Sequence, residues 1–300
     1  MGIENLNIKI GKLPSGKNNL ISDVKGIKVG HTTLNDGKIK TGVTALIPHT
    51  GNIFKEKLIC SSYVINGFGK SCGLMQIDEL GTLETPIILT NTLSVGTASN
   101  ALIKYMIKNN EDIGTTTGTV NPIVCECNDG FLNDIKGFHV KEEHVFQALE
   151  NAEVKFQEGS IGAGTGMSCY QLKGGIGSAS RVIKLDEKEY TIGAMVLSNF
   201  GLKKDLIING KKVGEKIITM ENEEQLEKGS IIIILATDIP MSERQLKRIS
   251  KRVPVSLART GSHIGNGSGD IVISFTTANK VNHHEKKDII NMKMINENKI

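Results

Sequence analysis

A single serine stands at the start of an isoleucine-rich run in GSIIIILATDIP, residues 229–240. Gly229 has no Cβ, so the next side chain can approach its carbonyl at little steric cost. Attack of the Ser230 hydroxyl on that carbonyl would give an ester that water hydrolyses. The product is a serine whose free α-amine, with an ordinary pKa of roughly 7.7–8.0, can act as a base near neutral pH. The segment therefore predicts a self-activating nucleophile; an ordinary strand start after a helix is the alternative.

A second set of polar side chains lies in the loop RTGSHIGNGSGD, residues 259–270. Ser268 and Asp270 are two positions apart, so an extended backbone points both side chains to the same side. A hydroxyl and a carboxylate placed in this way could orient a nucleophile or hold an ammonium group, and a polar turn is the alternative. His263 in the same loop is a candidate base for a Ser-His-Asp triad, although a lone loop histidine is usually just exposed.

Two glycine-rich stretches, GAGTGM at 162–167 and KGGIGSASR at 173–181, invite comparison with nucleotide-binding loops. Neither ends in the GK[ST] of a phosphate loop, and neither fits G-x-G-x-x-G between a strand and a helix. We expect tight turns that bring the backbone close to a ligand or to another strand. Cys125 and Cys127 lack a second pair of metal ligands, so we expect no zinc site.

The composition is that of a soluble globular protein. Hydrophobic residues make up 39% of the 300 residues, and charged residues 23%. The net charge of +4 is small and scattered and aromatic residues are scarce, which argues against a nucleic-acid partner. The N-terminus has no apolar run of signal-peptide length, and no apolar stretch of about 18 residues, the length of a membrane span, occurs in the sequence. The five cysteines form no disulfide framework, which predicts reduced thiols and a cytoplasmic protein.

Strand and helix patterns occur in both halves of the chain, so we expect one α/β domain with two sheets and covering helices. Ser230 begins a continuous apolar run, 230–237, that predicts a buried strand, and 190–201 predicts another. The other expected elements are hairpins at 20–47, a strand leading into a helix at 85–109, a helix at 141–152, a helix after the capping box of Ser242 and Gln245 that extends to Val253, a strand at 270–275 and, from residue 280, a peripheral helix or a frayed tail.

Seven stretches occur together, in order, in one family: ISDVKGIKVGHTTL (21–34), TPIILTNTLSVG (85–96), PIVCECNDGFLND (122–134), GAGTGMSCYQLKGGIGSASR (162–181), VLSNFG (196–201), GSIIIILATDIP (229–240) and ARTGSHIGNGSGDIVISFTTAN (258–279). The sequence resembles the self-processing aminopeptidases known as L-aminopeptidase/D-esterase and β-peptidyl aminopeptidase. The resemblance implies an α/β fold, a four-layer αββα sandwich like that of N-terminal-nucleophile hydrolases but with a distinct connectivity. It also implies a single domain, 1–300, that cuts itself between Gly229 and Ser230 into an α-chain, 1–229, and a β-chain, 230–300.

The resemblance assigns roles to the residues that match the family's motifs. Ser230 becomes the nucleophile, and its own α-amine the base. Ser268 and the acidic residue of the glycine-rich loop, here Asp270, support the nucleophile. Asn199, in the NFG turn, becomes the donor that stabilises the oxyanion through a side-chain N–H.

One position departs from the family pattern. Well-studied members carry a tyrosine in the loop that corresponds to ECNDG, where this chain has Asn128. Asparagine donates a hydrogen bond but lacks the reach and the aromatic wall of the phenol. An aminopeptidase must also hold the free ammonium of its substrate with a carboxylate, and Glu126 or Asp129 in the same loop is the candidate.

The sequence therefore predicts a cofactor-independent serine aminopeptidase that removes N-terminal residues from short peptides, amino-acid amides or esters. An acyltransferase of the self-processing ornithine acetyltransferase type is one alternative. A small-molecule-binding protein of the same fold that never matures is another. The family tendency predicts a homo-oligomer.

Overall fold

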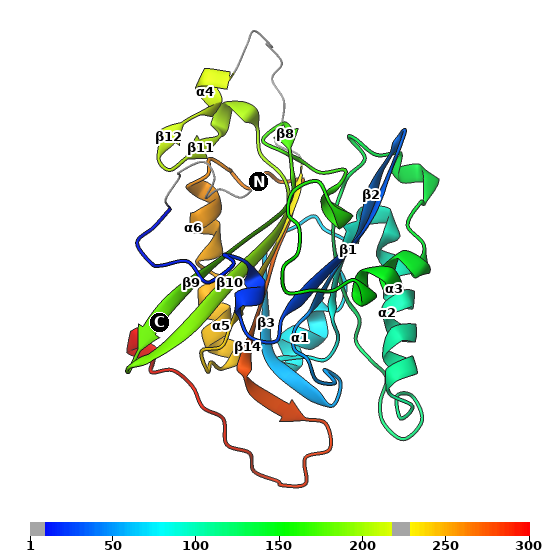
Figure 1. Cartoon of the computed structure of the whole chain (residues 1–300), viewed down its shortest axis with the longest axis vertical. Coiled ribbons are helices and arrows are strands. Elements are labelled where there is room, and N and C mark those ends of the chain that lie inside the picture. The colour runs from blue at the N-terminus through cyan, green and yellow to red at the C-terminus, as the bar shows by residue number, and fades with distance from the viewer. Residues whose placement is uncertain (1–9, 218–228) are drawn as a thin grey trace.

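The chain forms two large β-sheets that lie face to face in this computed structural model, which describes residues 10–217 and 229–300 (Figure 1). The smaller sheet has four strands, in the order β1 (Lys28–Asp36), β2 (Ile39–Ile47), β5 (Ile87–Asn91) and β6 (Ile123–Cys127). β5 and β6 run parallel, and the other neighbours are antiparallel. Every residue of β5 and β6 is buried, as expected for strands that are covered on both faces.

The larger sheet has six strands, in the order β4 (Thr82–Leu83), β3 (Glu56–Gly67), β14 (Gly269–Asn282), β13 (Ser230–Thr237), β10 (Lys188–Asn199) and β9 (Gly175–Leu185). β13 and β14 run parallel. The isoleucines of β13 alternate, because Ile232 and Ile234 join the main core whereas Ile231 and Ile233 join a second apolar cluster. Both faces of β13 are therefore buried, which explains why the run is continuously apolar.

Helices cover the outer face of each sheet and complete four layers (Figure 1). α2 (Val95–Asn109) packs on β5 and β6, and α3 (Glu142–Glu150) packs on β1 and β2. α5 (Glu243–Ser250) packs on β3 and β14, and Leu257 of α6 (Val253–Ala258) joins the second apolar cluster. The shorter elements are α1 (Leu74–Leu80), α4 (Gly214–Ile217), β7 (Ser168–Cys169), β8 (Leu172–Lys173), β11 (Ile207–Ile208) and β12 (Lys211–Lys212). Among the helices that the structure describes, none is long and apolar enough to cross a membrane.

Most of the expected elements are confirmed. The hairpin at 28–47, the strand and helix within 87–109, the helix at 142–150 and the strand at 230–237 are all present. The capping box forms at the start of α5, since the Gln245 N–H donates to Ser242 Oγ and the Ser242 N–H donates to Gln245 Oε1.

Two features differ from the expectation, the burial of β10 and the end of α5. β10 is not continuously buried, because its residues alternate between buried and half-buried from Gly193 onward. α5 ends at Ser250, and Val253 starts the separate helix α6. Pro254 follows directly and has no N–H to donate to the Ser250 carbonyl, which disfavours one continuous helix across this point.

The C-terminal segment is neither a peripheral helix nor a frayed tail. β14 runs on to Asn282, and the only helical turn beyond it is a short 3-10 turn at Glu297–Lys299. The Ile295 N–H donates to the Pro240 carbonyl (2.8 Å), and Gln245 Nε2 donates to the Ile295 carbonyl (2.8 Å). Arg244 also donates to the Glu297 carboxylate (2.6 Å). Polar contacts with Pro240 and with α5 therefore hold the chain end in place.

Candidate active site

Three neighbouring strands of the larger sheet place Ser230 between two other chain segments. Ser230 is the first residue of β13, and it pairs with Asn199 at the end of β10 and with Gly269 at the start of β14. Ser230 and Asn199 are only 6% and 7% exposed. The Gly269 N–H donates to Ser230 Oγ at 3.1 Å. The hydroxyl is therefore buried and held at a fixed position at the ends of the strands.

Ser268 and Asp270 lie beside the nucleophile candidate and contact each other. Ser268 Oγ donates to Asp270 Oδ1 at 2.5 Å, and the same oxygen accepts the Ile231 N–H at 3.2 Å. Both side chains are at most 2% exposed. Because Ile231 follows Ser230 directly, the carboxylate is fixed relative to the backbone of the nucleophile candidate.

Asn66 on β3 holds the glycine-rich loop, and sequence analysis did not predict this role. Its Nδ2 lies within hydrogen-bond distance of the carbonyls of Gly265, Asn266 and Ser268. Opposite Asp270, β3 carries one extra residue, which makes a β-bulge. Bulges bend a strand and re-aim its side chains. A lone asparagine within a strand gives no sequence signal for such a contact.

Gly229 occupies a space with no room for a side chain. A Cβ at this position would lie 2.1 Å from the Asn199 carbonyl oxygen and 2.8 Å from Phe200 Cα. Both are backbone atoms of a buried strand end, so neither can move aside cheaply. The glycine before the serine is therefore required by the close approach of β10.

The Asn199 side chain is oriented from both ends. Its Oδ1 accepts the Ser168 N–H at 2.9 Å, and its Nδ2 donates to the Asn128 carbonyl at 2.9 Å. A side-chain amide carries two N–H donors. One of them donates to the Asn128 carbonyl.

The Asn128 side chain turns into its own loop. It is exposed, and its Oδ1 accepts the Gly130 N–H at 2.9 Å, which is an Asx-type turn. Position 128 therefore reaches Asn199 through its main-chain carbonyl, whereas its side chain stabilises the turn that follows β6.

Glu126 lies in the site. Its side chain is 2% exposed; Oε1 accepts the Lys70 N–H at 2.7 Å, and Oε2 accepts a hydrogen bond from Thr92 Oγ1. A Cβ built on Gly69 would lie 3.4 Å from Glu126 Oε1 and 3.5 Å from Gly269 Cα. The carboxylate is therefore a close neighbour of the backbone that binds Ser230 Oγ.

Asp129, the other acidic candidate, holds the loop together. It is fully buried, and Asn133 donates to its Oδ1 at 3.0 Å. Its Oδ2 has no hydrogen-bond partner within residues 10–217 and 229–300. Burial raises the pKa of this carboxyl, which favours the neutral form. Of the two candidates, Asp129 is therefore the less suited to hold an ammonium group.

His263 does not form a triad with the serine. Its side chain is 76% exposed, and its Nε2 lies 3.7 Å from the Asp205 carboxylate. Asp270, the acidic residue of the glycine-rich loop, instead binds Ser268 and the backbone of Ile231. The imidazole is therefore on an exposed loop, as the alternative interpretation held.

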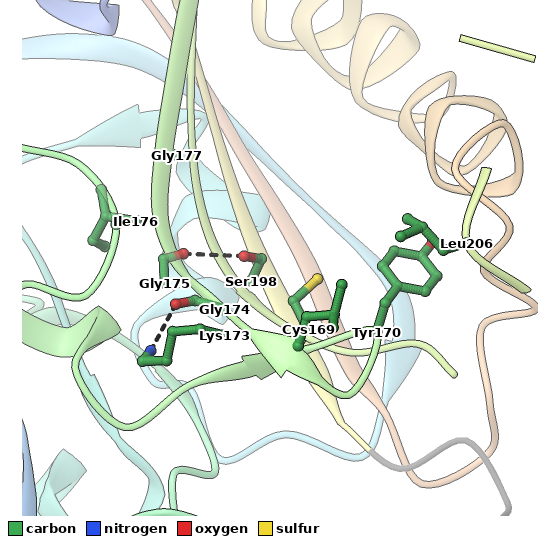
Figure 2. Close-up of a pocket in the computed structure, with 11 residues that line it drawn as sticks. Cys169, Tyr170, Lys173, Gly174, Gly175, Ile176, Gly177, Ser198 and Leu206 are labelled. Carbon is green, nitrogen blue, oxygen red and sulfur yellow. Dashed lines mark hydrogen bonds between the residues drawn. The ribbon is translucent and has the colours of Figure 1, made fainter. Parts of the chain in front are cut away.

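The glycine-rich stretches form close backbone contacts, as expected. A Cβ on Gly175 would lie 2.1 Å from the Gly159 carbonyl oxygen, and one on Gly164 would lie 2.6 Å from the Ile176 nitrogen. A cavity of about 330 Å³ opens beside these turns (Figure 2). Cys169, Lys173 and Ser198 are among the residues that line it.

One cluster among the described residues has the side chains of a metal site. It consists of Asp112, His283 and His284, whose ligand atoms lie within 4.8 Å of one another. Two lysines contact these groups. Lys57 Nζ lies 3.1 Å from His283 Nδ1, and Lys55 Nζ lies 3.5 Å from Asp112 Oδ2. The ammonium groups would repel a metal cation, so the cluster fits an ion-pair network better.

Cys125 and Cys127 are buried neutral thiols. Burial raises the pKa of Cys125 to about 12 and that of Cys127 well above its usual range. Cys127 Sγ lies 3.5 Å from the Leu197 carbonyl oxygen. A thiol must lose its proton to bind zinc, and both side chains instead pack between the sheets as small apolar groups.

Residues 19–300 match the family model of peptidase family S58. The chain belongs to peptidase family S58. It is 37% identical over 288 residues to the beta-peptidyl aminopeptidase BapA of Sphingosinicella microcystinivorans, covering 88% of this chain and 72% of that protein. It is similar to the solved structure of a protein from Pyrococcus horikoshii OT3, with 53% identity, a TM-score of 0.95 and coverage of 99% of this chain and 85% of that one. It is also similar to the solved structure of the L-aminopeptidase D-Ala-esterase/amidase of Ochrobactrum anthropi. The identity there is 34% and the TM-score 0.91, with coverage of 99% of this chain and 84% of that one.

These matches confirm the resemblance found in the sequence. The Ochrobactrum enzyme is described as a prototype of the serine aminopeptidases and as a variant of the Ntn-hydrolase fold. With a TM-score of 0.91 over nearly the whole chain, the fold class is confirmed as well. The S58 chain is a peptidase of the aminopeptidase kind, and thus a hydrolase.

Proposed function

We propose that this S58 peptidase cuts its own chain between Gly229 and Ser230 and then uses Ser230 to remove N-terminal residues from short peptides, amino-acid amides or esters. The products of self-cleavage are residues 1–229 and 230–300, which stay together in one folded domain. The observation that supports this most strongly is the position of Ser230. Ser230 is buried between the ends of β10 and β14, and the residue before it, Gly229, lies where no side chain fits.

Self-cleavage begins when Ser230 Oγ attacks the Gly229 carbonyl carbon. The hydroxyl proton moves to the Ser230 nitrogen as the C–N bond breaks, which leaves an ester between Gly229 and Oγ. Water then adds to the ester and the C–Oγ bond breaks. The products are the Gly229 carboxylate and a Ser230 with a free α-amine.

The free amine serves as the base in turnover. It accepts the Oγ proton as the hydroxyl attacks the substrate carbonyl, and it returns the proton to the leaving amine. The second N–H of Asn199 Nδ2 stabilises the negative oxygen that forms, since its amide is already fixed by Ser168 and Asn128. Water completes the cycle by hydrolysing the ester on Ser230.

Ser268 and Asp270 are assigned to positioning the nucleophile. Their mutual hydrogen bond and the bond from Ile231 N–H to Asp270 keep a negative charge close to the new α-amine. A nearby carboxylate favours the ammonium that forms when the amine takes up the Oγ proton.

Glu126 is assigned to the substrate ammonium. The two hydrogen bonds to its carboxylate, from the Lys70 N–H and the Thr92 hydroxyl, come from neutral donors. A buried carboxylate with neutral donors gains further stabilisation from a cationic ligand. This requirement explains a preference for substrates with a free amino terminus.

We further infer a cytoplasmic homo-oligomer. The five cysteines are free thiols, as expected in a reducing compartment. Family members tend to form oligomers, and exposed apolar side chains such as Met75 (89%), Phe131 (83%) and Val255 (63%) are candidates for contacts between subunits. Light scattering coupled to size exclusion tests the assembly, and a monomer at micromolar concentration contradicts it.

The experiment compares wild type with Ser230→Ala on amino-acid p-nitroanilides and on dipeptides that begin with an α- or a β-amino acid. The wild type should release the N-terminal residue, and N-acetylation of the substrate should abolish the release. Ser230→Ala should remain one chain and lack activity, because one hydroxyl serves both reactions. Activity of the alanine variant at the wild-type rate contradicts the proposal.

A further inference from the structure

The two glycine-rich turns enclose the ammonium group of Lys173. Its Nζ donates to three main-chain carbonyls, those of Gly164 (2.9 Å), Met167 (2.8 Å) and Gly174 (2.7 Å). Figure 2 shows the ammonium turned toward Gly174, beside the cavity. All three N–H donors of the lysine are thereby used on the protein itself. The group is therefore built in as part of the structure, although the residue as a whole is exposed.

One peptide unit connects this ammonium to Asn199. The carbonyl of Met167 accepts from Lys173 Nζ, and the N–H of the same peptide, which belongs to Ser168, donates to Asn199 Oδ1 at 2.9 Å. A peptide unit is planar and conjugated. A cation at its oxygen draws electron density from its nitrogen, which makes the N–H a stronger donor.

The same reasoning applies to the next amide in the chain of hydrogen bonds. The Asn199 side chain accepts at Oδ1 and donates at Nδ2. A stronger hydrogen bond at Oδ1 makes the Nδ2 protons better donors to an anion, because hydrogen bonds in series polarise one another. Two amides thus connect the Lys173 ammonium to the Nδ2 protons of Asn199.

Close packing fixes the geometry of this connection. A Cβ on Gly174 would lie 2.5 Å from the Ser198 carbonyl oxygen and 2.9 Å from the Cys169 nitrogen. The Gly174 N–H also donates to the Met167 carbonyl at 2.9 Å. The turn that carries Ser168 is therefore pressed against the strand end that carries Asn199.

We propose that Lys173 is a positioning residue that orients and polarises the Asn199 side chain through the peptide between Met167 and Ser168. The proposal rests on the proposed role of Asn199 as the oxyanion donor. It explains why the glycine-rich stretches 162–167 and 173–181 enclose a lysine rather than a phosphate group.

The kinetic test uses Lys173→Met, which keeps the length of the side chain but removes the charge, and Lys173→Arg, which keeps the charge. Lys184→Met is the matched control, since Lys184 is exposed and pairs with Glu187 on the surface. We expect Lys173→Met to lower kcat by about tenfold with KM within about twofold, less than the 10²–10³ expected for loss of an oxyanion donor. Lys173→Arg should lose less, and Lys184→Met should match the wild type.

The spectroscopic test separates this role from a general structural one. In ¹⁵N-asparagine-labelled Ser230→Ala protein, Lys173→Met should shift the Nδ2 signals of Asn199, and Lys184→Met should leave them in place. An unchanged kcat, or a lower kcat with unmoved Asn199 signals, overturns the proposal. If Lys173→Met does not fold, Lys173→Arg is the deciding variant, because arginine changes the donor geometry. The proposal is then overturned if this variant leaves both kcat and the Asn199 signals unchanged.

Failure of the proposed function has a different outcome. If Asn199→Ala keeps the wild-type kcat, Asn199 is not the oxyanion donor. The signal shift in Lys173→Met would still test the connection between Lys173 and the Asn199 amide.

Discussion

Replacing Gly229 by alanine should block self-cleavage, because the space beside Gly229 is occupied by backbone. The alanine Cβ would lie 2.1 Å from the Asn199 carbonyl oxygen and 2.8 Å from Phe200 Cα. An ordinary contact of this kind is longer by about 1 Å or more, so the start of β13 must shift by a similar amount. A misplacement of about 1 Å in a reacting group can cost on the order of 10²-fold in rate. We therefore expect self-cleavage of Gly229→Ala to slow at least 100-fold.

The assay is a time course of intact mass after rapid purification, with the fraction of uncut chain fitted to a single rate. Gly267→Ala is the matched control, since it lies in the glycine-rich loop and its Cβ would meet nothing within 4 Å. This control should cleave within about threefold of the wild-type rate. Cleavage of Gly229→Ala within the same threefold range would refute the steric argument for glycine at this position.

Three further outcomes follow from the site and the core. Glu126→Gln should raise KM for substrates with a free amino terminus by at least tenfold, with self-cleavage intact. An unchanged KM would show that another group binds the substrate ammonium. His263→Ala should change kcat/KM less than tenfold, and a loss of 100-fold or more, the range of a general base, would move this imidazole into the site. Burial lowers the pKa of His31 from 6.5 to about 4. The unfolded chain then binds a proton that the folded chain excludes, so His31 alone should lower the free energy of unfolding by about 2 kcal/mol from pH 7 to pH 5. In urea unfolding of Ser230→Ala protein, His31→Gln should make the fall in the free energy of unfolding smaller by this amount, and an equal fall in both proteins contradicts the assignment.

Asn128→Tyr tests the position where the chain leaves the family pattern. A phenol there should raise kcat on small amino-acid amides by adding an oxyanion donor, and it should tighten selectivity against bulky ones. The measurement is kcat and KM for alanine and leucine p-nitroanilides on fully matured proteins. Because the Asn128 side chain now bonds Gly130, an unchanged kcat and selectivity would show that residue 128 contributes only its carbonyl.

The local pattern predicted the elements that position the nucleophile. The run of isoleucines after Ser230 has a strand on each side and buried faces, and such burial leaves a readable apolar signature. The capping box at Ser242 is also a short-range feature, because its two hydrogen bonds join residues three apart.

Long-range contacts could not be predicted in this way. Asn66 holds the loop around Gly265 and Ser268 across some 200 positions, and no spacing rule connects them. The choice between Glu126 and Asp129 also depended on the fold, because both are acidic and lie three positions apart. Only the strand geometry turns Glu126 toward Lys70 and Thr92 and leaves Asp129 buried within its loop.

The most direct test of self-activation is the amino-terminal sequence and intact mass of the purified protein after prolonged incubation. Cleavage between Gly229 and Ser230 predicts two fragments, residues 1–229 and 230–300, with serine followed by four isoleucines at the new amino terminus. A single uncut chain that hydrolyses amino-acid amides, or a new amino terminus at Ser268 or elsewhere, would contradict Ser230 as the self-activated nucleophile.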